Sequence, residues 1–412
     1  MLDPLLSLRG GTTVASLNRP WRFAPKQTYD PQTNPEGLIS FGTAENHLVT
    51  DELVEFAQKN VHTHKTDFLY RGATAGGPDF PQALVAHLNE YLKPYKPIHV
   101  QDVQISNSAS AMHDALAWAL ADKGNAFLTS RPVYGRFDLD FFNKSGVKVE
   151  YADTTAQDCF DDTVVEKFAE ALQSCEARGV KVKAIFIVNP NNPLGKCYPR
   201  ETLVEIMKFC NQHRLHLFSD EIYACSVFDS GEPTAVPFTS VLSLDTDKYI
   251  DRCLLHVTWG LSKDFGAAGL RIGALISRSP SVIKAVESVA RFHNASAPSL
   301  SIGAAMLSDR EWCRGFVNTS RHRLAAAYRH VTRGLDEMGI EYLRGTNAGF
   351  FVWINLSPYL SEQERFPEFA LATKLQRCGV FLHPKEEHSL ETGWFRLVYV
   401  QDSETVTEGL KR

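Results

Sequence analysis

The chain has 412 residues, of which 44% are hydrophobic and 22% are charged, and its formal net charge at pH 7 is -5. This balance is typical of a folded protein, and the modest charge argues against a nucleic-acid-binding surface and against a disordered acidic tail. The length is too great for one ordinary core, so it favours two domains, or one large α/β domain with an appendage.

Cysteine usage and the first residues bear on the protein's location. The eight cysteines are scattered without a CxxC pair, which argues against a zinc site and against a secreted disulfide framework. The opening sequence MLDPLLSLRG contains an acidic residue and an apolar run too short for a signal peptide. No later segment reaches the roughly 18 apolar residues of a membrane span. We therefore expect a cytoplasmic protein with reduced cysteines, no metal, and no nucleic-acid or membrane partner.

The N-terminal part combines an irregular stretch with two predicted helices. Residues 1–36 are rich in Pro, Asn and Thr without a sustained period, which predicts an extended arm that packs elsewhere, for example on a partner subunit. A helix is expected from about Thr50, after a loop in which Glu45 is either a solvated acid or a site residue. A glycine-rich loop headed by Tyr70 then precedes a second helix with leucines at helical spacing.

A regular alternation of strands and helices follows. The residues VQDVQISNSASAMHDALAWAL predict a short strand that leads into an apolar helix, with Ala109 and Ser110 at the helix N-terminus. Bare amides and hydroxyls there can hold a phosphate, although simple N-capping is the commoner explanation. Helices are expected over residues 163–178 and 200–213, between the apolar strands AFLTS, VKVEYA, AIFIV, LHLFS, CLLHVTW and IGALIS. This order predicts an α/β fold with a largely parallel sheet covered on both faces.

Polar side chains follow several of these strands. AIFIV leads to Asn192, LHLFS to Asp220 and Tyr223, and AFLTS to Tyr134. Because ligands bind at the carboxyl ends of parallel strands, we expect these side chains to line one crevice. An aspartate that ends an apolar strand is costly unless its charge meets a cation or a strong donor.

The segment WGLSKDFGAAGLRIG after CLLHVTW carries the candidate for covalent chemistry. Lys263 lies among small residues that let the backbone approach a ligand closely, next to Ser262 and eight positions before Arg271. A nearby cation lowers the pKa of a lysine towards the neutral amine that attacks an aldehyde. The alternative is an ordinary surface turn. The choice between the two depends on whether other site residues occur at suitable positions elsewhere in the sequence.

Five motifs, in order, carry a resemblance: GTAENHL, NPNNPLG, SDEIY, LSKDFGAAGLRIG and GWFRLVY. The chain resembles the fold-type I pyridoxal phosphate (PLP) enzymes of the class I/II aminotransferase family, and most of all its 1-aminocyclopropane-1-carboxylate (ACC) synthase-like branch. The resemblance runs from about Asn34 to Tyr399. The spacings also agree, since 28, 43 and 133 positions separate Asn192, Asp220, Lys263 and Arg396 in turn.

The resemblance implies a role for each site residue. Lys263 would form a Schiff base with PLP and later move the Cα proton, while Asp220 would pair with the pyridinium nitrogen. Arg396 would clamp the substrate α-carboxylate. Tyr70 would enter the neighbouring subunit's site, which implies a homodimer, and Glu45 belongs to the substrate side. The remaining cofactor contacts implied are Asn192 and Tyr223 to the ring 3-hydroxyl, Tyr134 stacked on the ring, and Ala109, Ser110, Ser262 and Arg271 around the phosphate.

The element order also predicts the domains. A large PLP-binding domain is expected over residues 52–310, and residues 1–51 and 311–412 are expected to form the N-terminal arm and a smaller α+β domain. A long helix near 311–338 would join the two. The segment FFVWINLS is expected to be a strand of the smaller domain.

The chain departs from the branch at four places. Gly260 and Ala268 replace a usual serine and proline, the loop GATAGGPDF is longer, and HPKEEHSLETGW replaces a serine-rich loop. These departures suggest a substrate other than that of ACC synthase. We hypothesise an aminotransferase or a carbon-sulfur lyase of secondary metabolism that acts on an amino acid or an amino-acid-derived substrate. ACC synthase and a non-catalytic PLP-binding regulator are the alternatives.

Overall fold

The computed structural model describes residues 5–17, 28–385 and 387–412. Among these, the largest sheet has seven strands in the order β2-β8-β7-β6-β5-β3-β4. The pairs from β4 through to β7 are parallel, whereas β8 is antiparallel to both β7 and β2. The predicted largely parallel sheet is therefore confirmed. Its strands are β2 (Val103–Ser106), β3 (Ala126–Ser130), β4 (Lys148–Ala152), β5 (Val182–Val188), β6 (His216–Asp220), β7 (Leu255–Gly260) and β8 (Gly273–Ser277).

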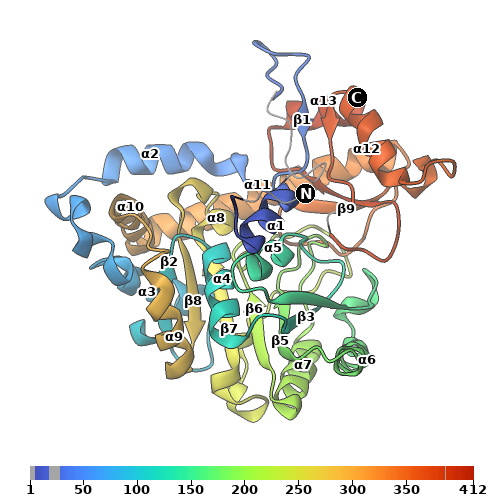
Figure 1. Ribbon diagram of the computed structural model, residues 1–412. Coiled ribbons are helices and arrows are strands. Elements are labelled where there is room, and N and C mark those ends of the chain that lie inside the picture. Colours follow the sequence, from blue (N-terminus) through green and yellow to red (C-terminus); the bar gives the residue numbers. More distant parts are fainter. Residues whose placement is uncertain (1–4, 18–27, 386) are drawn as a thin grey trace.

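Helices cover both faces of this sheet (Figure 1). The helices predicted over 163–178 and 200–213 are confirmed as α6 (Val164–Ala177) and α7 (Arg200–His213). The others in this part are α2 (Thr50–Asn60), α3 (Phe80–Tyr91), α4 (Ala109–Leu120), α5 (Phe137–Phe142), α8 (Leu261–Asp264), α9 (Pro280–Ala290) and α10 (Ala297–Ser308).

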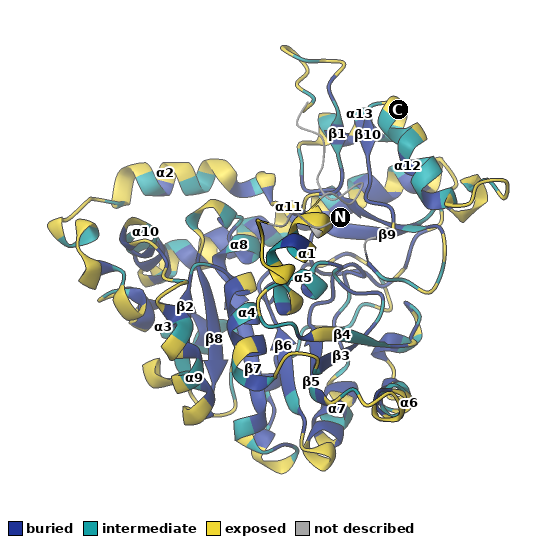
Figure 2. Ribbon diagram, viewed as in Figure 1, coloured by how far each residue is buried: buried dark blue, intermediate teal, exposed yellow. Residues whose placement is uncertain are grey.

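Alternate residues of one strand enter different cores. In β5, Phe186 packs with α4, α5 and α9 on one face, whereas Ile185 and Ile187 pack with α3, α6, α7 and α10 on the other. A strand buried on both faces needs apolar residues at every position, which is why AIFIV reads as an uninterrupted run. Figure 2 shows the resulting buried strands beneath exposed helix faces.

The C-terminal residues build smaller elements beside the sheet. β9 (Phe351–Asn355) pairs antiparallel with β11 (Trp394–Val398), and β1 (Ile39–Ser40) pairs parallel with β10 (Val380–Phe381). These strands share a hydrophobic cluster with α11 (Arg310–Glu337) and α13 (Ser403–Lys411), and α12 (Pro367–Arg377) packs nearby. The predicted long helix and the predicted strand in FFVWINLS are confirmed. The domain boundaries at 52 and 310 stay a prediction.

The N-terminal arm differs from its prediction. Residues expected to be extended include the helix α1 (Leu8–Leu17). The hydroxyls of Thr12 and Thr13 each donate to the carbonyl oxygen four residues earlier, at 2.9 Å. These bonds satisfy two β-branched polar side chains inside a helix, where they otherwise compete with the backbone. The part of the arm at 18–27 lies outside the described residues.

Two further observations concern the described part of the chain. No helix there has both the length and the apolar character needed to cross a membrane. The cysteines are free thiols.

The start of α4 lies against the start of β8 with no room for a side chain between them. A Cβ at Gly273 would come within 2.2 Å of the carbonyl carbon of Ser108 and 2.4 Å of the amide nitrogen of Ala109. Only glycine lets the two backbones approach this closely.

We predict that Gly273→Ala lowers the free energy of unfolding by about 1–3 kcal/mol, because the methyl group forces the backbones apart. Urea denaturation measures this. Gly315→Ala is the matched control, since a Cβ at that exposed position of α11 meets nothing within 4 Å, and it should be neutral or stabilising. Equal effects of the two variants would contradict the prediction.

Candidate active site

A cavity of about 430 Å³ opens at the carboxyl ends of the parallel strands. Of the predicted site residues, all but Tyr70 line it, and Tyr70 is 97% exposed. Those that line the cavity are Glu45, Ala109, Ser110, Tyr134, Asn192, Asp220, Tyr223, Ser262, Lys263, Arg271 and Arg396. The structure therefore brings together segments that lie up to 351 positions apart in the sequence.

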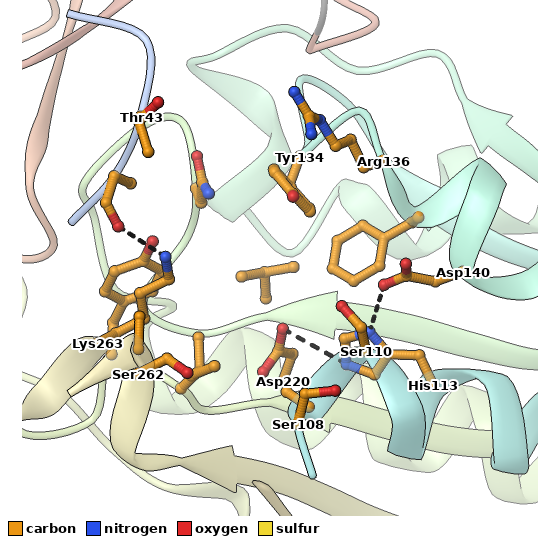
Figure 3. Close-up of a pocket in the computed structure, with 18 of the residues that line it drawn as sticks. Thr43, Ser108, Ser110, His113, Tyr134, Arg136, Asp140, Asp220, Ser262 and Lys263 are labelled. Carbon is orange, nitrogen blue, oxygen red and sulfur yellow. Dashed lines mark hydrogen bonds and ion pairs between the residues drawn. The ribbon is translucent and has the colours of Figure 1, made fainter. Parts of the chain in front are cut away.

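Lys263 lies in the short helix α8, directly after β7, rather than in an open loop. Its Nζ donates a hydrogen bond to the carbonyl oxygen of Ala44 at 2.6 Å, which Figure 3 shows as a dashed line. Burial, followed by the charge of Arg396, lowers the pKa of Lys263 to about 8, against smaller opposing effects of Glu45 and Asp220. The amine is thus far easier to deprotonate than an ordinary lysine.

The next residue holds α8 in place. The carboxyl group of Asp264 is buried and accepts three hydrogen bonds, from the Cys225 amide, the Ser226 hydroxyl and the Trp259 indole nitrogen, at 2.7–2.9 Å. Burial raises the pKa of Asp264 to about 6 in spite of these bonds. This network anchors the backbone that carries Lys263.

Asp220 ends β6 and is buried below the cavity. Its Oδ1 accepts from the Thr258 hydroxyl at 3.1 Å, and its Oδ2 lies 3.8 Å from His113 Nε2. Burial raises the pKa of Asp220, and the charge of His113 and the Thr258 hydrogen bond only partly oppose it. A cationic ligand group next to this carboxylate would favour its ionised form.

His113 and Asp140 belong to the site but were not predicted. His113 Nδ1 lies 3.0 Å from Asp140 Oδ2, so that the imidazole bridges two carboxylates (Figure 3). Burial lowers the pKa of His113, but the hydrogen bond that its imidazole donates to Asp140 and the charges of Asp220 and Asp140 outweigh it, and the net shift is upward. Sequence reasoning had one usable signal, because His113 follows Ala109 by one helical turn and so shares its face.

The N-terminus of α4 offers an anion cradle. Ser108 is the N-cap and accepts from the Ala111 amide at 3.1 Å. Ala109 and Ser110 of the first turn line the cavity together with Ser262, and helix N-termini favour negative charge. Arg271 also lines the cavity, and its backbone is left-handed, with φ 53°.

Arg396 in β11 is buried and lines the cavity. Its Nη1 donates to Asn192 Oδ1 at 2.9 Å and its Nη2 to the Gly42 carbonyl at 3.0 Å. The guanidinium carbon lies 6.0 Å from the centre of the Tyr134 ring and 5.9 Å from that of Phe351. These contacts fix the plane of the guanidinium, which suits bidentate binding of a carboxylate.

The arrangement suits a planar aromatic ligand with a phosphate at one end and a basic ring nitrogen at the other. The cradle at α4 fits the phosphate, and Asp220 fits the protonated nitrogen. Tyr134 lies across the cavity from Asp220 (Figure 3). The deprotonated Lys263 amine can attack an aldehyde on such a ligand.

Comparisons with known proteins agree with this geometry. The profile of the aminotransferase class I and II family matches residues 38–412. A human protein, 1-aminocyclopropane-1-carboxylate synthase-like protein 1, is 33% identical over 392 residues, which cover 93% of this chain and 77% of that protein. The 1-aminocyclopropane-1-carboxylate synthase of Glycine max is 31% identical over 404 residues, 95% of this chain and 83% of that protein.

The fold also matches solved structures. The aspartate aminotransferase of Thermus thermophilus with maleate superposes with a TM-score of 0.73 at 20% identity, covering 100% of this chain and 96% of that one. At this identity the likeness shows the fold alone. Together with the family match, it establishes that the chain belongs to the aminotransferase class I and II family and is a PLP-dependent enzyme.

Proposed function

We propose that the cavity binds PLP through Lys263 and removes the Cα proton of an amino acid or an amino-acid-derived substrate. The observation that carries this proposal is that Lys263, Asp220 and Arg396 line one cavity, where Asp220 and Arg396 are buried and Lys263 is half-buried. PLP, when bound, supplies an electron sink for the charge left at Cα.

Asp220 is proposed to keep the pyridine nitrogen protonated. Its buried carboxylate faces the cavity, and a carboxylate with a raised pKa gains most from a cationic partner. His113, held by Asp140, supports the negative charge of Asp220 from below. The residues fit the cofactor at this end.

The other cofactor contacts are assigned by their place in the cavity. Asn192 and Tyr223 are proposed to hydrogen-bond the ring hydroxyl, and Tyr134 is proposed to cover the ring face. Phosphate binding falls to the α4 cradle and its neighbours, namely Ala109, Ser110, Ser262 and Arg271.

Arg396 is proposed to bind the substrate's carboxyl group, and Lys263 to move the Cα proton. An amine with a pKa near 8 is close to the value at which a group both accepts and returns a proton at neutral pH. Glu45 lines the open side of the cavity and is assigned to the substrate.

Transamination and carbon-sulfur cleavage both begin with this proton removal, and so does ACC formation. The two relatives named as ACC synthase or ACC synthase-like support ACC formation as the alternative. A non-catalytic regulator has no need of an amine whose pKa is lowered as that of Lys263 is. Cytoplasmic residence is proposed on the free cysteine thiols.

We further propose a homodimer in which Tyr70 serves the partner's site. Tyr70 is 97% exposed and follows Phe68 and Leu69, which are 78% and 51% exposed. Three consecutive large, mainly apolar side chains that are exposed to solvent favour burial against a second protein surface.

The first prediction concerns pH. Below about pH 8 the rate of PLP capture by the cofactor-free protein should rise about tenfold per pH unit, and above it the rate should level off, because only the neutral Lys263 amine attacks. Absorbance of the bound cofactor after rapid mixing measures the rate. Arg396→Gln should move the midpoint upward, since the charge of Arg396 lowers the pKa of Lys263. A rate that keeps rising through about pH 10, as for an ordinary lysine, would contradict the assignment.

The second prediction tests the function by product. Holoenzyme is incubated with S-substituted cysteines, with amino-donor and keto-acid pairs, and with S-adenosylmethionine. The respective products are a thiol with a keto acid and ammonia, a new amino acid, and ACC with methylthioadenosine. Lys263→Ala should lower the observed turnover by about 10²–10⁴-fold or more, because the proton-moving amine is gone.

Lys284→Ala, at an exposed position of α9, is the control and should keep full turnover. Borohydride reduction followed by peptide mapping should place the cofactor on Lys263. Attachment of the reduced cofactor to another lysine, or full turnover by Lys263→Ala, would contradict the proposal.

The third prediction tests the shared site. Tyr70→Ala and Lys263→Ala should each be inactive, and mixing them should restore about a quarter of wild-type activity, because random exchange makes about half of the dimers hybrids with one complete site each. Subunit exchange is followed with differently tagged chains. Proven exchange without recovered activity would refute the role of Tyr70.

A further inference from the structure

A buried carboxylate lies beside the arginine assigned to the substrate's carboxyl group. Glu387 belongs to residues 383–385 and 387–393, between β10 and β11, which we call the strap. Its Oε1 lies 3.2 Å from Arg396 Nε, and the two side chains are 2% and 4% exposed. Among the described residues, the cavity lining includes Arg396 but not Glu387. Glu387 therefore acts on the guanidinium from outside the substrate space.

The strap holds this carboxylate in a fixed position. The Val133 amide donates to the Glu387 carbonyl oxygen at 2.9 Å, just before Tyr134 in the large sheet's loop. The neighbouring His388 donates from Nε2 to the Gly135 carbonyl at 3.3 Å and stacks on Tyr151, with ring centres 4.8 Å apart. Glu387 is thus built into the packing and is not a mobile surface acid.

The strap is also tied down at its far end. The Gly393 amide donates to Glu368 Oε1 at 2.9 Å, and Glu368 is itself only 4% exposed. Lys385 Nζ lies 3.8 Å from the other oxygen of the same carboxylate. Contacts on both sides of Glu387 therefore hold the strap against the body of the protein.

The ion pair changes what Arg396 can select. A guanidinium without an acidic partner would attract a substrate carboxylate with a full positive charge. Here a free α-carboxylate has to bring a second negative charge to a buried cation that is already compensated, and in a desolvated site that costs affinity. A neutral carbonyl oxygen can still accept from the η nitrogens without that repulsion.

We propose that Glu387, acting through Arg396, sets substrate selectivity by lowering the preference for a free α-carboxylate. Amino-acid derivatives whose carboxyl group is masked as an amide or ester then bind nearly as well as the free acid. The inference deepens the proposed function and rests on it, because it takes Arg396 as the site of the substrate's carboxyl group.

The test uses two stable ligands that are anchored by their cofactor part, N-(5'-phosphopyridoxyl)-L-alanine and N-(5'-phosphopyridoxyl)-L-alaninamide. Calorimetry gives the Kd of each for the cofactor-free full-length protein, so no turnover is needed. For the wild type we expect the two Kd values to agree within about fivefold, since the charge of Arg396 is compensated.

Glu387→Gln keeps the shape and an acceptor for Arg396 Nε but removes the charge. It should tighten binding of the carboxylate ligand by about tenfold or more and change the amide ligand by less than about twofold. Glu391→Gln, a carboxyl change in the same strap, is the control and should leave the ratio of the two Kd values as in the wild type. A purely structural role of Glu387 would weaken both ligands together.

An unchanged ratio in Glu387→Gln, or a wild type that already prefers the carboxylate by about a hundredfold or more, would overturn the inference. The ratio of the two Kd values in the wild type tests the inference even if the Glu387→Gln variant does not fold. Failure of both ligands to bind the wild type would instead refute the proposed function, and this inference with it.

Discussion

Charge burial at the carboxyl end of the parallel sheet is the constraint on which the site depends. Asp220 and Arg396 are buried there, and Lys263 is half-buried beside them. Burial pushes the pKa of the lysine down and that of the aspartate up, so that both groups move towards their neutral forms. The neutral lysine amine is the form that attacks an aldehyde. Asp220 has to be ionised to pair with a protonated ring nitrogen, so such a ligand offsets the cost of burying its charge.

The rest of the fold keeps these groups apart and in place. Parallel strands deliver their last residues to one edge of the sheet, and α4 begins at the same edge. Gly273 allows α4 to start directly against β8, and Asp264 anchors the turn of helix that carries Lys263. The fold therefore departs from ordinary packing rules at the site, where it buries charged side chains and brings two backbones into direct contact.

Most of the sheet and 11 of the 23 residues that line the cavity could be predicted from the sequence, because local signals specify them. AIFIV is an uninterrupted apolar run, and residues 200–213 have a helical period that the structure matches in full. The helix α1 was missed because its two glycines and two threonines hide its period. Asp140 and Glu387 were missed for another reason, since their roles depend on contacts with distant segments, His113 and Arg396 respectively, that no local pattern encodes.

The hydrogen bond from Lys263 to the Ala44 carbonyl has a consequence for the protein as a whole. The segment around Ala44 continues from β1, which pairs with β10 next to the strap, so this one bond links the N-terminal segment to the large sheet. A lysine nitrogen engaged with an aldehyde has fewer N–H groups to donate. Capture of an aldehyde by Lys263 would therefore weaken this link, and we expect faster amide hydrogen exchange at residues 42–46 in protein that has bound PLP.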